Sequence, residues 1–254
     1  MGYHPGALRL AEMLVEAADT LRDDFDPEAR LRRLSDHCVE LLPAQGAGVL
    51  YADGGDVRLV AGGRRRDVVH ALLAAQREGG PCRDVLDTGA AVAPVRIGSA
   101  GSMARWPAFT GLAGAYGVTR TFAVPLRHGG ATLRVLNVFG TRPPRDEHVA
   151  PGEAESRLAQ ILAAATALGL SHHRTLTGCR TLAAQLQHAL DSRVRVEQAK
   201  GVLAERRHTG ADEAFEALRR YARTERRAID LVATQVIEGT LDCAALRRDR
   251  PAPS

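Results

Sequence analysis

The stretch GAGVLYADGGDVRLVAG, residues 46–62, decides the fold of the first half of the chain. It contains two short runs with strand-like alternation, separated by the turn sequence at residues 53–55. Alternation with a period of two is typical of strands, and an Asp-Gly pair supplies the positive φ values of a tight turn. The stretch therefore predicts a β-hairpin.

Helical patterns flank this hairpin. Apolar residues recur at intervals of three and four over residues 8–21 and 31–42, and again over 64–80, where a double glycine ends the pattern. The segment AVAPVRI, residues 91–97, predicts a short strand on an edge or at a bulge, because Pro94 has no backbone N–H to donate.

A second pair of alternating runs covers residues 118–140, and a long helix is predicted from about Glu153. Between the two strand regions, residues 101–117 suggest a loop with a short helix that closes over a cavity. This order of elements predicts an antiparallel sheet of about five or six strands with helices packed against it, which is an α+β fold.

No strand pattern follows residue 175. Helices are predicted over about 182–207, 211–222 and 226–238, and Gly239 is placed to cap the last of them. We expect an N-terminal helix over 1–26, a mixed domain over 27–170, a helical linker over 171–181, an all-helical domain over 182–242 and a disordered tail over 243–254.

The composition favours a soluble cytoplasmic protein. The longest apolar run, ILAAATALGL from Ile161, is about half the ~20 residues that a membrane span needs. The four cysteines lie far apart and form no ligand pattern with histidine, so we expect neither disulfides nor a metal site. Among 34 basic residues, Lys200 is the only lysine, and the arginine excess itself is typical of GC-rich coding.

Positive charge is concentrated near Lys200. Residues 193–227 contain ten basic and six acidic side chains, an excess equal to the formal charge of +4 of the whole chain. A helical stripe with heptad-like spacing enters this region, and Arg193 and Lys200 occupy two of its places. The apolar members of the stripe are Leu182, Leu186, Ala189, Val196 and Leu203.

Two interpretations of Arg193 and Lys200 remain open at this point. In one, the two side chains extend over their neighbours or pair with Glu197, which is within helical reach of both. In the other, they lie beside Gly201 and face a phosphate, because a residue without a side chain permits close approach.

Residues 182–239 resemble an ANTAR domain, the three-helix RNA-binding module of bacterial antitermination regulators. The resemblance rests on the Leu-x-x-Ala-Leu-x-Ser-Arg run over 186–193, on EQAKG over 197–201, and on EAF, LR and YA through Ala222. It implies binding to paired RNA hairpins with short apical loops, by a homodimer that meets along the first helix.

The resemblance also assigns roles to residues. The implied RNA-binding residues are Arg193, Lys200, Arg206, Arg219, Arg220 and Arg223, and Gly201 belongs to the same predicted surface because it lies beside Lys200. Aromatic stacking is common in recognition of single-stranded RNA, so Tyr221 is a candidate base-stacking platform. Phe215 is predicted to belong to the core instead. The implied dimer seam consists of Leu182, Leu186, Ala189 and Leu190.

Residues 27–170 resemble a GAF domain, of the subtype fused to ANTAR in actinobacteria. The matching stretches are GAGVLYADGGDVRLVAG, GGPC at 79–82, RWPAF at 105–109, AVPLR and LRVLNVF. GAF domains are often small-molecule sensors, so Cys82, Trp106 and Phe109 are candidate pocket residues. The alternatives to these pocket roles are that Cys82 is a buried, unreactive thiol and that Trp106 and Phe109 pack within the core.

These features favour an RNA-binding antitermination regulator that is controlled by a GAF sensor and needs no cofactor. A DNA-binding factor is the alternative, with residues 226–238 as its recognition helix, although that helix is basic only at its start. An enzyme is disfavoured because no catalytic spacing is present, and the pair Asp84 and Asp87 is predicted to be a solvated helix start.

Overall fold

The computed structural model describes residues 5–19, 25–53, 56–128, 131–141, 152–242 and 246. The chain divides into two compact units, Met1–Thr175 and Leu176–Ser254. Several predicted segments lie outside the described residues. They are the turn residues 54–55 and 129–130, most of the polar connection before Glu153, and the predicted tail with Cys243, apart from Leu246.

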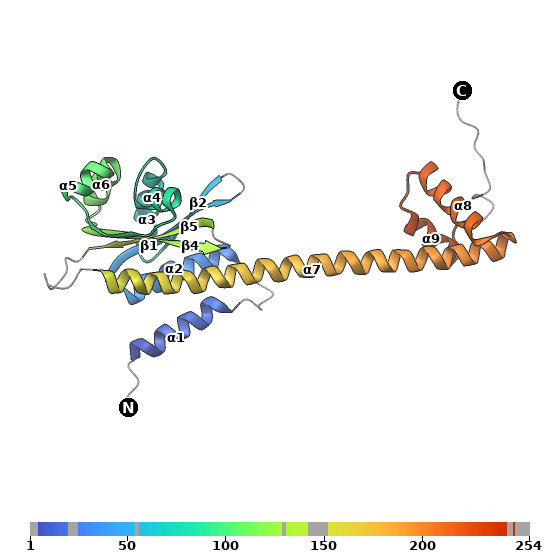
Figure 1. Ribbon diagram of the computed structural model, residues 1–254, viewed down its shortest axis with the longest axis horizontal. Helices are drawn as coiled ribbons and strands as arrows, with labels where there is room; N and C mark the ends of the chain where they lie inside the picture. The colour runs from blue at the N-terminus through green and yellow to red at the C-terminus, as the bar shows by residue number, and fades with distance from the viewer. Residues whose placement is uncertain are drawn as a thin grey trace, which may run out of the picture. The chain divides into compact units, whose positions relative to one another are not determined.

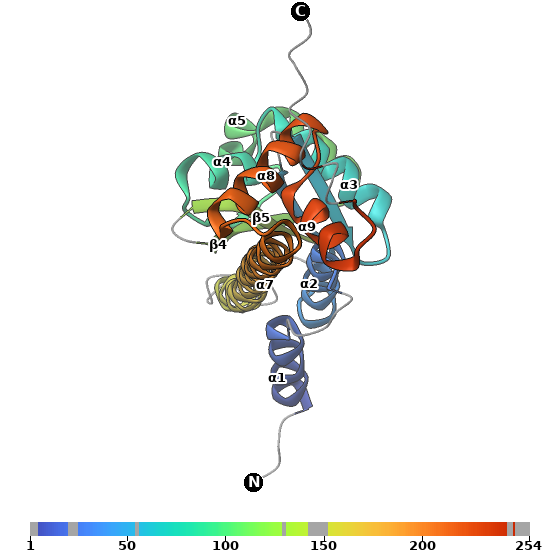
Figure 2. The ribbon, with the colours of Figure 1, turned by 90° about the vertical axis from the view of Figure 1, so that its right-hand side faces the viewer.

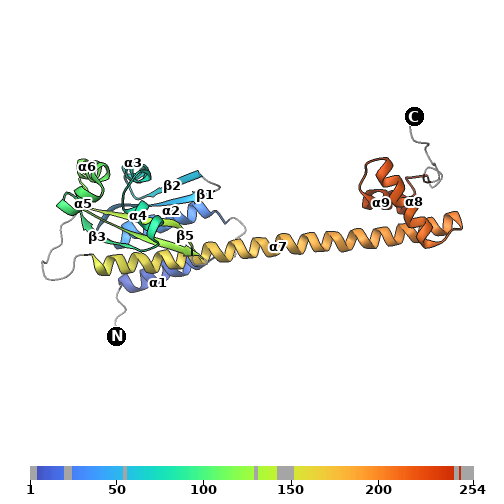
Figure 3. The same cartoon turned by 45° about the horizontal axis from the view of Figure 1, so that its top comes forward.

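The first unit is built on a five-stranded antiparallel sheet with the order β2-β1-β5-β4-β3 (Figures 1 and 3). Its strands are β1 (Ala44–Asp53), β2 (Asp56–Gly62), β3 (Val92–Arg96), β4 (Arg120–His128) and β5 (Ala131–Gly140). The two predicted hairpins and the α+β class are confirmed. β3 is an edge strand whose register shifts between Val92 and Val95, so the sheet places Pro94 as predicted.

Strict alternation along β5 assigns its side chains to the two faces of the sheet. Leu136 and Val138 belong to one buried apolar cluster, whereas Val135 and Phe139 belong to the other. Because successive residues of a strand point to opposite faces, a strand that is covered on both sides needs apolar residues at nearly every position. The sheet is therefore a central layer between two layers of helices (Figure 1).

The first face is covered by α2 (Pro27–Leu41) and the beginning of α7 (Glu153–Arg207), and α1 (Pro5–Ala18) packs against these helices. Helix α2 begins at Pro27, and the side chain of Asp26 caps it by accepting the backbone N–H of Glu28. In Figure 2, α1 lies on the side of α2 and α7 that faces away from the sheet. Its Met13 is nevertheless fully buried in the same cluster.

The second face is covered by α3 (Arg66–Ala74), the 3-10 turn η1 (Ala75–Arg77), α4 (Pro81–Thr88), α5 (Ala100–Arg105) and α6 (Pro107–Ala115). The segment predicted as a loop with one short helix thus forms two helices, and that prediction was wrong in its helix count. The Ser99 side chain caps α5 by accepting the N–H of Ser102. Pro107 starts α6 directly afterwards, so the chain folds into two short helices with a corner at Trp106.

The second unit is helical throughout its described elements. It consists of the later part of α7, α8 (Ala211–Thr224) and α9 (Ile229–Glu238). Its core contains Val196 and Leu203 from α7, Leu218 from α8 and Val232 from α9. Gly239 ends α9 at φ 73°, a left-handed conformation that glycine adopts without strain, as predicted.

Among the described residues, none of the helices is both long and apolar enough to cross a membrane.

Candidate functional sites

The two basic residues of the α7 stripe differ in their surroundings. Arg193 is exposed and makes no hydrogen bond or ion pair with any described residue. The Nζ atom of Lys200 lies 2.5 Å from Oε2 of Glu197, and the lysine side chain is 23% exposed. The structure therefore shows the predicted Glu197 pair for Lys200, while Arg193 is free within the described chain.

The other basic side chains of α7 partly serve the fold of the second unit. Arg206 is exposed, but its Nη1 donates a hydrogen bond of 3.2 Å to the carbonyl of Val236 in α9. Nη2 of Arg195 lies 3.7 Å from Asp230 Oδ2 and also connects α7 to α9. Arg206 is thus held close to α9, which the sequence pattern alone did not reveal.

Helix α8 presents three exposed arginines, Arg219, Arg220 and Arg223. Arg219 and Arg223 are four residues apart and share one side of the helix. Arg219 pairs with Glu216 at 3.7 Å, but both side chains are about half exposed or more, so water screens this pair. Tyr221 is half-buried against the core of the unit.

Gly201 is a helical glycine that the packing of its own unit does not require. A Cβ atom built at Gly201 meets no other atom within 4 Å. Glycine inside a helix costs about 1 kcal/mol relative to alanine. The residue thus opens the surface next to Lys200 without any benefit to the internal packing.

The predicted dimer seam lies on a part of α7 that none of the other described residues covers. Every residue from Arg174 to Asp191 is exposed, including Leu182, Leu186, Ala189 and Leu190. Val196 and Leu203, which continue the same stripe, are buried against α8 and α9. The residues of the stripe are therefore exposed before Arg193, and its apolar residues after Arg193 are buried.

The three candidate pocket residues of the first unit are buried in one apolar cluster. Cys82 and Phe109 have no exposed surface, and Trp106 is 3% exposed. The indole N–H of Trp106 donates to Oδ2 of Asp84, which also pairs with Arg105 at 2.7 Å. Asp84 is thus more than a solvated helix-start residue, because it holds the corner between α5 and α6.

Burial also sets the chemistry of the thiols. Desolvation raises the pKa of Cys82, and it raises the pKa of Cys38 to about 12. Both thiols are consequently protonated near neutral pH and poor nucleophiles. Cys179, in contrast, is exposed on α7.

A buried polar network that no local sequence pattern indicates lies beneath the same helices. Gln76 donates to Oδ1 of Asn137 at 2.9 Å, and Asn137 donates to the Thr121 hydroxyl and to the carbonyl of Phe122. The Gln76 carbonyl oxygen accepts the backbone N–H of Cys82 at 2.8 Å. The amides of Gln76 and Asn137 are therefore occupied within the protein itself.

This network explains the GGPC stretch. Gly80 has φ 154°, and a Cβ atom there would lie 2.5 Å from Cγ of Gln76. Only glycine lets the backbone pass this close to Gln76 before Pro81 starts α4. The GGPC stretch matches the GAF sequence pattern, but only the fold shows that it packs against Gln76 and bonds to it through the N–H of Cys82.

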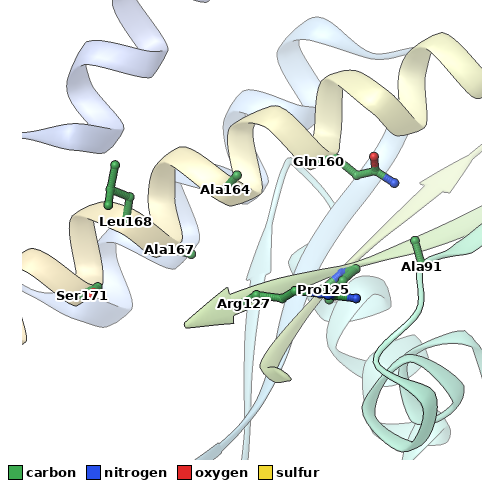
Figure 4. Close-up of a pocket in the computed structure, with 8 residues that line it drawn as sticks. All are labelled: Ala91, Pro125, Arg127, Gln160, Ala164, Ala167, Leu168 and Ser171. Atoms are coloured by element: carbon green, nitrogen blue, oxygen red, sulfur yellow. The ribbon is translucent and has the colours of Figure 1, made fainter. Parts of the chain in front are cut away.

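A groove of about 580 Å³ opens elsewhere on the first unit, between the beginning of α7 and the end of β4 (Figure 4). Its lining includes Gln160, Ala164 and Leu168 from α7, and Pro125 and Arg127 from β4. It shares no residue with the predicted pocket around Cys82, Trp106 and Phe109. No group of His, Cys, Asp and Glu among the described residues has the geometry of a metal site.

The fold and the surfaces together define a two-unit protein in which an α+β unit precedes a compact helical unit with exposed arginines. A model of the GAF domain family matches residues 26–171, and a model of the ANTAR domain family matches residues 184–237. Because the first match covers more than half of the chain, the protein belongs to the GAF domain family, and it combines this domain with an ANTAR domain.

Solved structures of similar fold include the GAF domain of a phosphoenolpyruvate-protein phosphotransferase from Acinetobacter. Its identity is 14%, with 68% of this chain and 97% of that chain covered and a TM-score of 0.47. A GAF domain/HD domain protein from Geobacter sulfurreducens has 17% identity over 64% of this chain and 98% of that chain, with a TM-score of 0.42. No curated protein sequence matches the chain.

Proposed function

We propose that the protein is a cytoplasmic, dimeric, non-enzymatic regulator that binds paired hairpins in nascent transcripts. Its GAF domain senses a small molecule, and its ANTAR domain contacts the RNA. The observation that best supports this proposal is the exposed arginine surface of the ANTAR domain, with Arg219, Arg220 and Arg223 on α8 and Arg193 on α7.

In the proposed mechanism, the arginines and Lys200 bind phosphates, and these contacts position the RNA. Bases in the short apical loops provide sequence specificity, with Tyr221 as a stacking partner. Binding stabilises the antiterminator hairpins at the expense of a terminator. Since each phosphate contact releases a counterion, affinity falls steeply with salt.

The alternative, a DNA-binding factor that reads the major groove with α9, receives little support from that helix. The sequence of α9, IDLVATQVIE, contains no lysine or arginine, and its exposed positions include Leu231 and Glu238. Major-groove recognition depends on donors such as arginine or lysine for guanine and amides for adenine. Promoter DNA is therefore the competing outcome in the test below.

The test is to crosslink the protein to nucleic acid in its native cells, purify it and sequence what is bound. Lys200→Ala is compared with Arg180→Ala, which removes an exposed positive charge outside the predicted surface. We expect transcript leaders with paired short-loop hairpins, depleted in Lys200→Ala and retained in Arg180→Ala. Recovery of promoter DNA, or equal RNA recovery with both variants, would contradict the proposal.

A further inference from the structure

The three described helices of the ANTAR unit end in the same backbone motif. After each helix one residue adopts the left-handed conformation: His208 after α7 at φ 51°, Arg226 after α8 at φ 52° and Gly239 after α9 at φ 73°. In each case the N–H of this residue bonds to the carbonyl three residues earlier, and the next N–H bonds to the carbonyl five residues earlier. This pair of hydrogen bonds is the Schellman motif, which satisfies carbonyl groups at the end of a helix.

The residue in the left-handed position differs between these helix ends. Among the described residues, seven glycines have a positive φ, and the only other residues that do are His208 and Arg226. A side chain in this conformation brings its Cβ atom too close to the following carbonyl oxygen, so glycine is the usual residue at such a helix end. Histidine is one of the residues that tolerate the conformation best, together with asparagine and aspartate, and arginine is not. Arg226 therefore occupies a position where glycine or asparagine would be less strained.

Attraction between a positive side chain and the helix dipole does not explain this arginine. A basic residue near the C-terminus of a helix is favourable. The last turn of α8 already contains Arg223, and that of α7 contains Arg206 and Arg207. Helix α9 has no basic residue in its last turn, yet it ends in Gly239. The basic residues thus follow the two helices that need a further positive charge least.

The side chain of Arg226 does not contribute a polar contact to the described structure either. It is exposed and makes no hydrogen bond or ion pair with any described residue. Its backbone N–H lies 3.2 Å from the carbonyl oxygen of Arg223, so the motif holds these two residues close together. A strained residue whose side chain has no partner in the described chain points to a partner outside it.

The charges around the end of α8 indicate an anionic partner. Residues 219–227 contain five arginines and a single acidic residue, Glu225. All five arginines are exposed. Guanidinium groups remain charged near neutral pH and bind two phosphate oxygens at once. A chain of phosphates can contact several of these arginines together, which a single small anion cannot.

We propose that the RNA-binding surface of the ANTAR unit continues from Arg219 and Arg223 around the end of α8, where Arg226 binds a phosphate of the RNA backbone. This contact is the reason why the chain has an arginine in a position that suits glycine. The phosphate assignment rests on the proposed RNA-binding function. It adds Arg226 to the residues that the sequence resemblance assigns to the surface.

The test replaces Arg226 in the full-length chain by residues that suit the left-handed conformation. Arg226→Gly and Arg226→Asn remove the charge and relieve the strain, so we expect the ANTAR unit to melt about 2–4 °C higher in calorimetry. In filter binding, the same variants should bind a two-hairpin RNA about five- to tenfold more weakly, with a salt dependence reduced by about one counterion. A residue that serves only the end of the helix would change the melting temperature and leave the affinity as it is.

Two control variants separate the effect of charge from that of backbone conformation. Arg226→Lys keeps the positive charge in the strained position, so its RNA affinity should stay within about threefold of the unsubstituted protein. Arg180→Ala removes an exposed charge outside the predicted surface and should change the affinity by less than about twofold. Unchanged affinity in both Arg226→Gly and Arg226→Asn would overturn the phosphate contact. A lower melting temperature in both would show that the arginine serves the fold, and would overturn it as well.

Titrations of the unsubstituted protein and of Lys200→Ala with the same RNA separate failure of the Arg226 contact from failure of the proposed function. If the unsubstituted protein binds the hairpin RNA through Lys200, and the Arg226 variants bind it equally well, only the Arg226 contact is wrong. If the unsubstituted protein binds no hairpin RNA, the proposed function is wrong, and the Arg226 contact with it.

Discussion

The two units of this protein place their polar chemistry in opposite locations. In the GAF unit, Gln76, Asn137 and the thiol of Cys82 are inside and surrounded by protein partners or apolar side chains. In the ANTAR unit, the core cluster is apolar, and arginines such as Arg193 on α7 and Arg219 and Arg223 on α8 lie exposed on the surface.

This difference separates residues that specify a fold from residues available to a partner. A buried, fully bonded amide favours one packing arrangement, because any alternative leaves it unsatisfied. An exposed arginine contributes little to stability and remains available for a phosphate. Substitutions in the first unit should therefore change the free energy of unfolding, and those on the surface of the second should change affinity.

The largest effect is expected for Phe109→Ala. Phe109 is completely buried between α6 and the sheet, so truncation leaves a cavity and should lower the free energy of unfolding by about 3–5 kcal/mol. Calorimetric or denaturant unfolding of the GAF unit measures this loss. RNA affinity below the melting temperature should remain unchanged. If Phe109→Ala also lowers RNA affinity, residues that stabilise the GAF unit and residues that bind RNA are not separate sets.

Asn137→Ala should destabilise the same unit by about 1–3 kcal/mol, because Gln76 and Thr121 lose their partner inside the protein. Denaturant unfolding checks the value. Thr119→Ala is the milder comparison, because Thr119 is an exposed residue whose hydroxyl donates to the carbonyl of Gly140. If Asn137→Ala costs almost no free energy of unfolding, the buried groups of Gln76 and Thr121 do not depend on Asn137 as their hydrogen-bond partner.

Lys200→Ala should lower RNA affinity about tenfold and reduce the salt dependence by about one counterion, with unfolding unaffected. Glu197→Gln provides the reverse test. It removes the carboxylate 2.5 Å from the Lys200 ammonium and should strengthen RNA binding. Filter binding across a series of salt concentrations measures both variants, and the assignment fails if both behave like the unsubstituted protein.

Gly201→Ala should have opposite effects on the two properties of the ANTAR unit. Alanine improves helix propensity by up to about 1 kcal/mol and meets no atom of this chain, so thermal stability should rise. If the glycine admits a phosphate, RNA affinity should fall in the same variant. Higher stability with unchanged affinity would remove Gly201 from the interface.

The smallest expected effect is on the pH dependence of the GAF unit. Burial lowers the pKa of His37 below its ordinary value of 6.5. The charges of Arg33 and Arg9 lower this pKa further. The carboxylates of Glu16 and Glu40 raise it, but they do not cancel the effect of burial. The unfolded chain then binds a proton more readily than the folded one. Stability should therefore fall as pH drops below about 6.5, and His37→Gln should flatten this part of the profile.

Sequence patterns predicted the elements whose periodicity is strong. The alternation over 46–62 and 118–140 gave the two hairpins, and Pro94 placed β3 at an edge. The corner at Trp106 was missed, because its two short helices depend on Ser99 and Pro107 rather than on periodicity.

Tertiary contacts explain what the patterns could not provide. The pairing of Gln76 with Asn137 joins residues 61 positions apart, so no local signal reveals it. The stripe on α7 was visible as a heptad-like repeat, but only the packing of α8 and α9 shows that it is exposed up to Val194 and buried from Val196. Likewise, only the fold shows which charged residues, such as Arg193, have no ion-pair partner among the described residues.

A titration of the protein with a two-hairpin RNA and with duplex DNA of the same sequence, over a range of salt concentrations, distinguishes an RNA-binding regulator from a DNA-binding factor. We expect the protein to prefer the RNA, with an affinity that weakens steeply with salt and falls in Lys200→Ala but not in Arg180→Ala. Equal or tighter binding of the DNA, or RNA binding that does not depend on Lys200, would contradict it.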